Sequence, residues 1–469
     1  MRSTPVLARR AVTRLDEDPL TARLELVYKT ASPSKLLVRA VAAVAALAAM
    51  LTALAVAAAA ANDALDVIGH EAGPQVVATT DLYFALSDAD AQVATLLLLG
   101  TSDQAGTDEA RARYDQRRGE IAAALLEAHR LAGDDAAQRT TIETVMEHYG
   151  RYEQLAAEAL LLAEQAAYPQ GEAPPDVVAA YREAGDLMSG QLLPLSYNLT
   201  LENATAVREA YDRAESRIDT GLLVVAVAGA IALAALVWLQ IHLARGYGRV
   251  FNPSLLVATA VCLLYLGTGL AVLNAEQSAQ QTAKEGGFDN ALSLARANAV
   301  SNALYVDQVR YLLDAERAAI YEQTLFDKAQ ALHYREAGNL GEYRDLLAEA
   351  WNAPLAAPER TPGLLSEAFT GSDATWDAAR AWQTLMNADA AMREGDGTAA
   401  ERLASVREAY IDYDTALAAL SEEHLGTFRA GIEEGEQAIA DFAFLLPAAM
   451  VALAAFTFTG IAPRLREFR

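Results

Sequence analysis

Residues 221–243 read GLLVVAVAGAIALAALVWLQIHL, and residues 254–273 read SLLVATAVCLLYLGTGLAVL. Neither run contains Asp, Glu, Lys or Arg, and each can cross about 30 Å of hydrocarbon as a helix, which takes roughly 20 residues. The connecting residues 244–253, ARGYGRVFNP, are few and basic. The two runs therefore predict an antiparallel pair of membrane-spanning helices, since a helix satisfies its own backbone hydrogen bonds in lipid.

The composition indicates a membrane protein with large acidic segments. Of the 469 residues 53% are hydrophobic, yet the formal net charge is −25. Two further apolar runs, 36–61 and 442–462, bring the expected spans to four. The first run could be read as a signal peptide, but it is longer than the roughly 7–15 apolar residues of a cleaved signal. We expect an all-α integral membrane protein with transmembrane helices at 36–61, 221–243, 254–274 and 442–462.

Basic residues in the short segments predict the orientation. The leader 1–35, the turn 244–253 and the tail 463–469 carry Arg and Lys, and four spans place all three on one side. By the positive-inside rule that side is the cytoplasm of a plasma-membrane protein, with both termini inside. The acidic segments 62–220 and 275–441 then lie outside. Their charge argues against nucleic acid as a partner, and the spans are expected to contact membrane lipid.

Both acidic segments are expected to form a four-helix bundle. They are rich in Ala, Leu, Glu, Gln and Arg, which favour helices, and they lack alternating Val and Ile. For the first segment, turn and capping residues predict helices at 62–99, 108–132, 135–168 and from 176 into the second span, with a distortion near Ser189, Gly190 and Pro194.

The second acidic segment gives less regular signals. We expect one helix over 276–335, unbroken or bent near Gly286 and Gly287, and a loop at 353–372. Further helices are expected at 373–393 and from 398 into the last span, with a kink at Pro447.

Weak internal repeats suggest that the two parts arose by tandem duplication. The paired stretches lie about 214 to 220 residues apart and keep the same order. They are SPSKLLVRA (32–40) with NPSLLVATA (252–260), HEAGPQ (70–75) with KEGGFD (284–289), and ALSDADA (85–91) with AVSNALY (299–305). The alternative is that two alanine-rich helical segments look alike through composition alone.

No pattern in the sequence indicates catalysis, a metal ion or a cofactor. Histidines occur at 70, 129, 148, 242, 333 and 424, and no two are spaced as ligands on one helical turn. There is no phosphate-binding glycine loop and no nucleophile motif. The single cysteine, Cys262, lies in the third span. We expect a protein that is not an enzyme.

Two sets of polar residues were considered as functional candidates. Arg39 and His242 lie near the inner ends of the first two spans, where snorkelling to the interface is the expected role. A cluster of arginines in the first acidic segment could line a pocket for direct ligand sensing, although we expect these side chains to be solvated. The cluster is Arg111, Arg113, Arg117 and Arg118.

The layout of span, helical bundle and span resembles the sensor module of chemotaxis receptors and sensor kinases. With its duplication, its paired LSDADA and VSNALY stretches and its small cytoplasmic segments, the chain is similar to the actinobacterial GlnX family of four-span proteins. The resemblance implies a relay from an extracytoplasmic amino-acid-binding lipoprotein to a cytoplasmic Ser/Thr protein kinase. It transfers no binding residues. A non-catalytic envelope scaffold and a direct small-molecule sensor remain as alternatives, and homodimerisation stays open.

Overall fold

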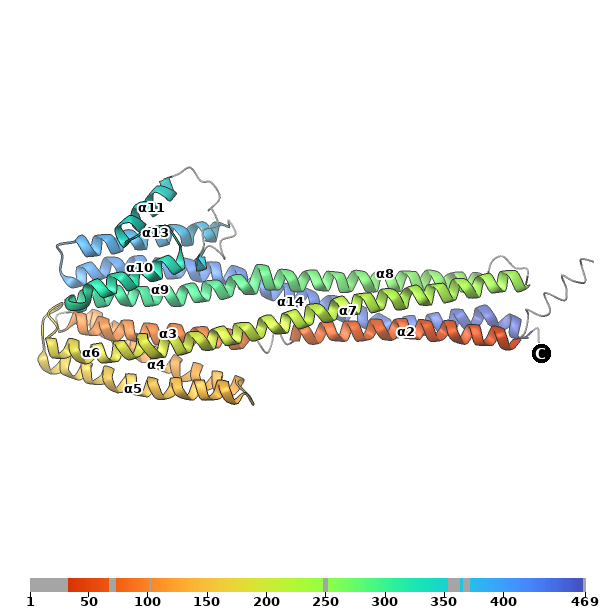
Figure 1. The fold of residues 1–469 in the computed structure, drawn as a ribbon, viewed down its shortest axis with the longest axis horizontal. Coiled ribbons are helices and arrows are strands. Elements are labelled where there is room, and N and C mark those ends of the chain that lie inside the picture. Colours follow the sequence, from red (N-terminus) through yellow and green to blue (C-terminus); the bar gives the residue numbers. More distant parts are fainter. Residues whose placement is uncertain are drawn as a thin grey trace, which may run out of the picture. The chain divides into compact units, whose positions relative to one another are not determined.

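The protein is described by a computed structural model that covers residues 33–66, 73–101, 103–247, 252–352, 363–365 and 372–466. Every regular element within these ranges is helical, which confirms the all-α prediction for the described part of the chain (Figure 1). Residues 1–32 of the leader, 248–251 of the turn, most of the 353–372 loop and 467–469 of the tail lie outside these ranges.

The described residues pack into two compact units. The apolar unit contains those within 1–61, 216–275 and 438–469. The polar unit contains those within 62–215, here called the first half, and 276–437, called the second half. Three helices, α7 (Leu193–Tyr247), α8 (Pro253–Gln281) and α14 (Ala399–Arg466), contribute residues to both units.

The apolar unit is built from α2 (Pro33–Asp66) and the apolar portions of α7, α8 and α14. Side chains from all four helices form its core. Among them are Leu47, Met50, Leu236, Cys262 and Leu453. Large apolar side chains also point outward. Val38, Leu223, Leu264 and Val451 are exposed. A helical unit that is apolar on its outer surface as well as inside suits a lipid environment.

Polar groups in the apolar unit find partners within it. Gln240 Nε2 donates to Leu255 O at 2.9 Å, and Asn252 Nδ2 donates to Gly460 O at 2.6 Å. Arg39 hydrogen-bonds the His242 ring, and its guanidinium lies 4.8 Å from the centre of the Trp238 ring. The structure therefore pairs Arg39 with His242, a contact that the expectation of independent snorkelling did not include.

Three of the four predicted spans coincide with helices long and apolar enough to cross a membrane. These helices cover Leu37–Ala61, Pro175–Arg245 and Pro253–Leu313. A fourth helix, Thr79–Leu99, also meets the length and composition criteria, but 89% of its apolar window is buried in the protein. The predicted span 442–462 appears as the shorter apolar stretch Pro447–Ala462 of α14, which continues through Pro447. The number of spans thus stays a prediction.

The first half contains α3 (Gly73–Leu99), α4 (Gln104–Leu131), α5 (Ala136–Ala166) and α6 (Pro175–Leu187). These match the predicted helices to within a few residues, except that α3 begins later and residues 67–72 are outside the described ranges. Asp103 and Asp135 cap α4 and α5 by accepting backbone N–H bonds. A π-helical stretch, Met188–Leu192, separates α6 from α7 at the predicted distortion.

The second half corrects the prediction of one helix over 276–335. A π-helical stretch, Thr282–Phe288, follows α8, and α9 (Asp289–Leu313) ends at Asp314. Asp314 leaves helical geometry, and its carboxylate accepts hydrogen bonds from Arg182 at 2.7 Å and Tyr321 at 3.2 Å. Tertiary contacts therefore end the helix where sequence propensity favoured its continuation.

After Asp314 the chain turns back along α9. The returning helix is α10 (Ala318–Leu332), and α11 (Leu340–Asn352), α13 (Asp373–Glu394) and α14 follow it in the chain. The α10 helix packs on α9 (Figure 1).

Both halves of the polar unit share one hydrophobic core. The same cluster of buried side chains contains Leu86 and Tyr152 of the first half and Leu304, Trp382 and Tyr413 of the second. The helix α3 packs on α4 of its own half and also on α9 of the other half. Two tandem four-helix bundles are therefore not confirmed, and the question whether the two acidic segments pack together is answered by their forming one compact unit.

We expect Leu97→Ala to lower the free energy of unfolding of the polar unit by about 2–5 kcal/mol, because Leu97 is fully buried in the shared core. Leu126→Ala removes the same atoms from a side chain that is 68% exposed. This substitution should change the free energy of unfolding by less than about 0.5 kcal/mol. Urea titration of the full chain in detergent measures both free energies, followed by tryptophan fluorescence, to which the buried Trp382 contributes. Equal effects would contradict a core shared at α3.

Candidate functional site: the seam between the two halves

The repeat-related stretches meet at the interface between α3 and α9, which we call the seam. Residues 87–91 of α3 and 301–305 of α9 are all buried. Asn302 Nδ2 donates to Phe84 O across the seam at 3.2 Å. Both stretches therefore bury polar as well as apolar side chains. A helix at the protein surface would instead leave its polar side chains exposed to solvent.

A buried ion pair joins the two halves at the seam. Arg310 Nη2 of α9 lies 2.6 Å from Asp90 Oδ2 of α3, and both side chains are under a tenth exposed. Arg310 also donates from Nε to Tyr181 OH at 3.0 Å and from Nη2 to Gly185 O at 3.3 Å, both on α6, and its Nη1 lies 4.0 Å from Asp307 Oδ1. Tyr152 and Tyr181 donate to Asp90 Oδ1 at 3.2 and 3.3 Å. The pair thus has the additional hydrogen bonds that a buried charge needs.

The electrostatics keep the guanidinium of Arg310 charged. Burial is the largest single effect and lowers its pKa, but the attraction of Asp90, together with Tyr181 and Asp307, outweighs burial, so the pKa is raised well above its ordinary value. Burial, and then the charge of Asp90, raises the pKa of Tyr152 well above its ordinary value. Burial is also the main cause of the raised pKa of Tyr181, whereas the positive charge of Arg310 lowers that pKa. The tyrosines therefore remain donors to the carboxylate near neutral pH.

Gly185 leaves room for this arrangement. A Cβ atom at this position would lie 2.8 Å from Arg310 Nη2, which is closer than such contacts allow. The guanidinium of Arg310 therefore explains why a glycine, which is unfavourable inside a helix, occupies position 185.

Three further arginines make four more ion pairs between the halves. Arg182 of α6 binds Asp314 and Glu316, with Nε 2.7 Å from Asp314 Oδ2. Arg317 binds Asp186 at 2.9 Å, and Arg407 of α14 binds Glu109 of α4. Exposed pairs such as Arg317–Asp186 contribute less than about 1 kcal/mol each. Of the pairs between the halves, only Asp90–Arg310 has both side chains less than a tenth exposed, and Arg182–Asp314 has one buried partner.

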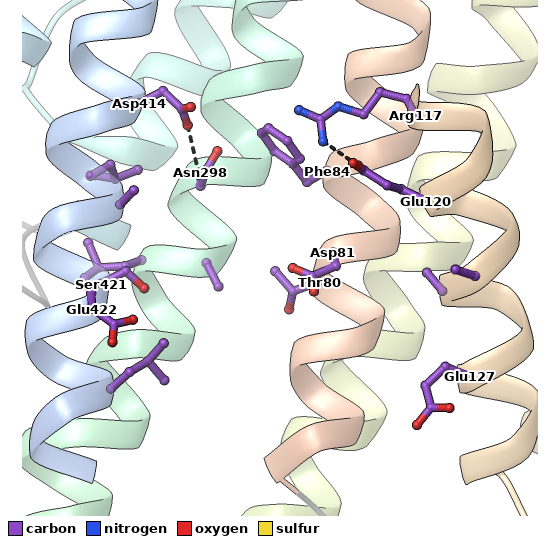
Figure 2. Close-up of a pocket in the computed structure, with 17 residues that line it drawn as sticks. Thr80, Asp81, Phe84, Arg117, Glu120, Glu127, Asn298, Asp414, Ser421 and Glu422 are labelled. Atoms are coloured by element: carbon purple, nitrogen blue, oxygen red, sulfur yellow. Dashed lines mark hydrogen bonds and ion pairs between the residues drawn. The ribbon is translucent and has the colours of Figure 1, made fainter. Parts of the chain in front are cut away.

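A cavity of about 730 Å³ lies between the halves, with walls from α3, α4, α9 and α14 (Figure 2). Apolar groups of its walls include Phe84, Leu294, Leu417 and Leu425. The charged groups that line it are five acids and one base. They are Asp81, Glu120, Glu127, Asp414, Glu422 and Arg117.

Some of the carboxylates that line this cavity form ion pairs with arginines, and others do not. Glu127 and Glu422 pair with Arg130 and Arg429, which lie outside the lining. Arg117 pairs with Asp88 at 2.5 Å and with Glu120. Burial raises the pKa of Glu120, but hydrogen bonds from Gln116 and Arg117 outweigh it and leave the pKa lowered.

Asp81 and Asp414 make no ion pair with any residue that the structure describes. Loss of hydration raises the pKa of Asp81, and the charge of Glu120 adds to this. Loss of hydration is also the main cause of the raised pKa of Asp414, and the hydrogen bond from Asn298 opposes it.

The arginine cluster considered as a ligand site is not brought together. Only Arg117 lines the cavity, where it is held by Asp88 and Glu120 and lies 4.8 Å from the centre of the Phe84 ring. Arg118 pairs with Glu153 and Arg113 with Glu109, while Arg111 is exposed. An arginine pocket for an anionic ligand therefore has no support in this geometry.

Sequence reasoning missed the seam. Asp88, Asp90 and Arg310 look like ordinary surface charges in a helical pattern. The available signal was that Asp88 and Asp90 interrupt the apolar window Thr79–Leu99, where a carboxylate needs a buried partner. Among the residues that the structure describes, no group of three or more His, Cys, Asp or Glu is placed to hold a metal ion.

We expect Asp90→Asn and Arg310→Met each to lower the free energy of unfolding by about 3–5 kcal/mol, since each leaves a buried group without its partner. In the double variant the loss of unfolding free energy should be about 0.5–3 kcal/mol smaller than the sum of the losses in the two single variants. Urea titration of the full chain measures all three values. Arg118→Gln, at the exposed pair with Glu153, should cost less than about 1 kcal/mol. Strict additivity would show that Asp90 and Arg310 do not act as a pair.

The comparisons with known proteins give one match. Residues 64–212 match the family model described as an actinobacterial sensor domain. The searches of curated proteins and of solved structures found no match. The matched range falls within the first half and includes α3 to α6 together with Asp90, Tyr152, Tyr181 and Gly185. This match supports the assignment of residues 64–212 to an actinobacterial sensor family.

Proposed function

We propose that the chain is a transmembrane signal relay, in which the polar unit receives an extracytoplasmic signal and helix movement carries it to a cytoplasmic partner. The actinobacterial sensor domain suggests a sensing or signalling role. The observation that carries the relay mechanism is helical continuity. The helices α7 and α14 run without interruption from residues of the polar unit into residues of the apolar unit. Packed helices are rigid along their axes and can transmit small shifts.

The two π-helical stretches support the same mechanism. Met188–Leu192 directly precedes α7, and Thr282–Phe288 directly follows α8. Short π-helical stretches are rare and often lie at functional sites. A change between π-helical and α-helical hydrogen bonding at either stretch would rotate the helix that enters the apolar unit.

The partners proposed here follow from the resemblance to the GlnX family. An extracytoplasmic lipoprotein loaded with an amino acid binds the polar unit, and a cytoplasmic Ser/Thr protein kinase binds the inner ends of the spans. The alternative functions are a non-catalytic envelope scaffold and a direct small-molecule sensor. Cross-linking and co-purification from membranes distinguish them, because the relay requires partners on both sides whereas a scaffold requires no kinase.

We expect both termini to lie in the cytoplasm. In a Cys262→Ala background, Glu158→Cys on the exposed face of α5 should react with a membrane-impermeant maleimide in intact cells. Arg245→Cys, at the basic end of α7, should react only after the cells are permeabilised. The reverse labelling pattern would overturn the orientation.

We expect Ser216→Pro to uncouple output from input. Ser216 is an exposed residue inside α7 at the boundary of the two units, and proline there removes a helical hydrogen bond and kinks the helix. The kinase output, measured by substrate phosphorylation after amino-acid addition, should fall at least tenfold while the lipoprotein still co-purifies. Ser216→Ala is the control and should respond like the wild type. An unchanged response in Ser216→Pro would contradict transmission through α7.

A further inference from the structure

The cavity between the halves has apolar walls and an acidic lining. Leu294 and Leu417 lie on the side of the second half, and Phe84 and Ala124 lie on the side of the first. Its volume of about 730 Å³ lies within the range of small-molecule sites. Because α3, α4, α9 and α14 all contribute, a molecule in this cavity would touch both halves at once (Figure 2).

The charge of the lining selects the kind of molecule. Asp81 on α3 and Asp414 on α14 stand on opposite walls, and neither has a cation of the described protein within ion-pairing distance. The one lining cation, Arg117, is already shared by Asp88 and Glu120. A carboxylate or phosphate ligand would find no unshared cation among these groups, whereas an ammonium group would find two carboxylates.

A buried amide points to the same chemistry. Asn298 Nδ2 donates to Asp414 Oδ1 at 3.1 Å, which fixes the orientation of the amide. Asn298 Oδ1 is buried and has no hydrogen-bond partner among the described residues, although such atoms are rarely left unpaired. Asn298 is a partly buried residue of the cavity lining, and a small turn of its amide would bring this oxygen to an N–H donor beside Asp414.

We infer that the cavity binds a linear aliphatic amine with two or more cationic nitrogens, one held by Asp81 and another by Asp414 and Asn298. The methylene chain between the nitrogens lies against Phe84, Leu294 and Leu417. A divalent metal ion fits less well, because it needs several oxygen ligands around one point and no such group occurs among the described residues. Occupancy links α3 to α14 and therefore the two halves.

This inference does not depend on the proposed relay, since binding is measured on the purified chain without any kinase or lipoprotein. The probes are cadaverine and spermidine, titrated calorimetrically into the full chain in a neutral detergent at fixed ionic strength. Pentane-1,5-diol serves as the neutral analogue of cadaverine. We expect saturable binding of both amines that weakens with added salt, and no binding of the diol.

Variants of the cavity test the assigned residues. Asp81→Asn and Asp414→Asn should each weaken spermidine binding at least tenfold. Glu158→Gln removes the same charge from an exposed position of α5 outside the cavity and should leave binding within twofold. Ala418→Phe fills the cavity from an exposed position of α14 without changing its charge and should also weaken binding at least tenfold. Circular dichroism confirms that each variant is folded.

Four results would overturn the inference: no binding of either amine, equal binding of the diol, equal weakening by Glu158→Gln and Asp414→Asn, or undiminished binding in Ala418→Phe. Displacement of spermidine by Mg²⁺ at the same ionic strength with equal potency would also overturn it, because it would show that charge alone is recognised. Since none of these measurements involves output, their failure would leave the relay proposal intact.

Discussion

The polar unit depends on one buried contact, the ion pair between Asp90 of α3 and Arg310 of α9. A charge enters a protein interior only with a partner and with its remaining hydrogen bonds made. Here Tyr152, Tyr181 and Gly185 O complete the set. Because Asp90 and Arg310 lie 220 positions apart, in different halves, the contact fixes how the two halves meet as well as how each half is packed.

The region that matches the sensor family contributes only part of this contact. The matched residues 64–212 contribute Asp90, both tyrosines and Gly185, while Arg310 lies outside the match. The first half therefore does not complete its core alone, and the second half supplies the missing cation and apolar surface. The cavity has the same composite origin, with walls from both halves. A molecule bound there would act on the interface that the ion pair holds together.

Much of the fold could be predicted from local sequence. Apolar runs located α2, the apolar part of α7 and α8, and turn residues located α4 to α6, because helix formation and termination depend on neighbouring residues. The end of α9 at Asp314 could not be predicted, since its cause is Arg182, 132 positions away. The cavity was unpredictable for the same reason. Its arginine candidates also failed because nearby carboxylates, invisible in a linear pattern, engage Arg117 and Arg118.

The burial of α3 against α9 has a consequence for biogenesis. Synthesis proceeds from the N-terminus at about 5–20 residues per second, so the roughly 190 residues between the end of α3 and the start of α9 take about 10–40 s to make. During that interval the nascent first half can supply Tyr152 and Tyr181 to Asp90, but Arg310 and the apolar surface of α9 do not yet exist. The face of α3 that meets α9 therefore waits for residues that are made later in the same chain.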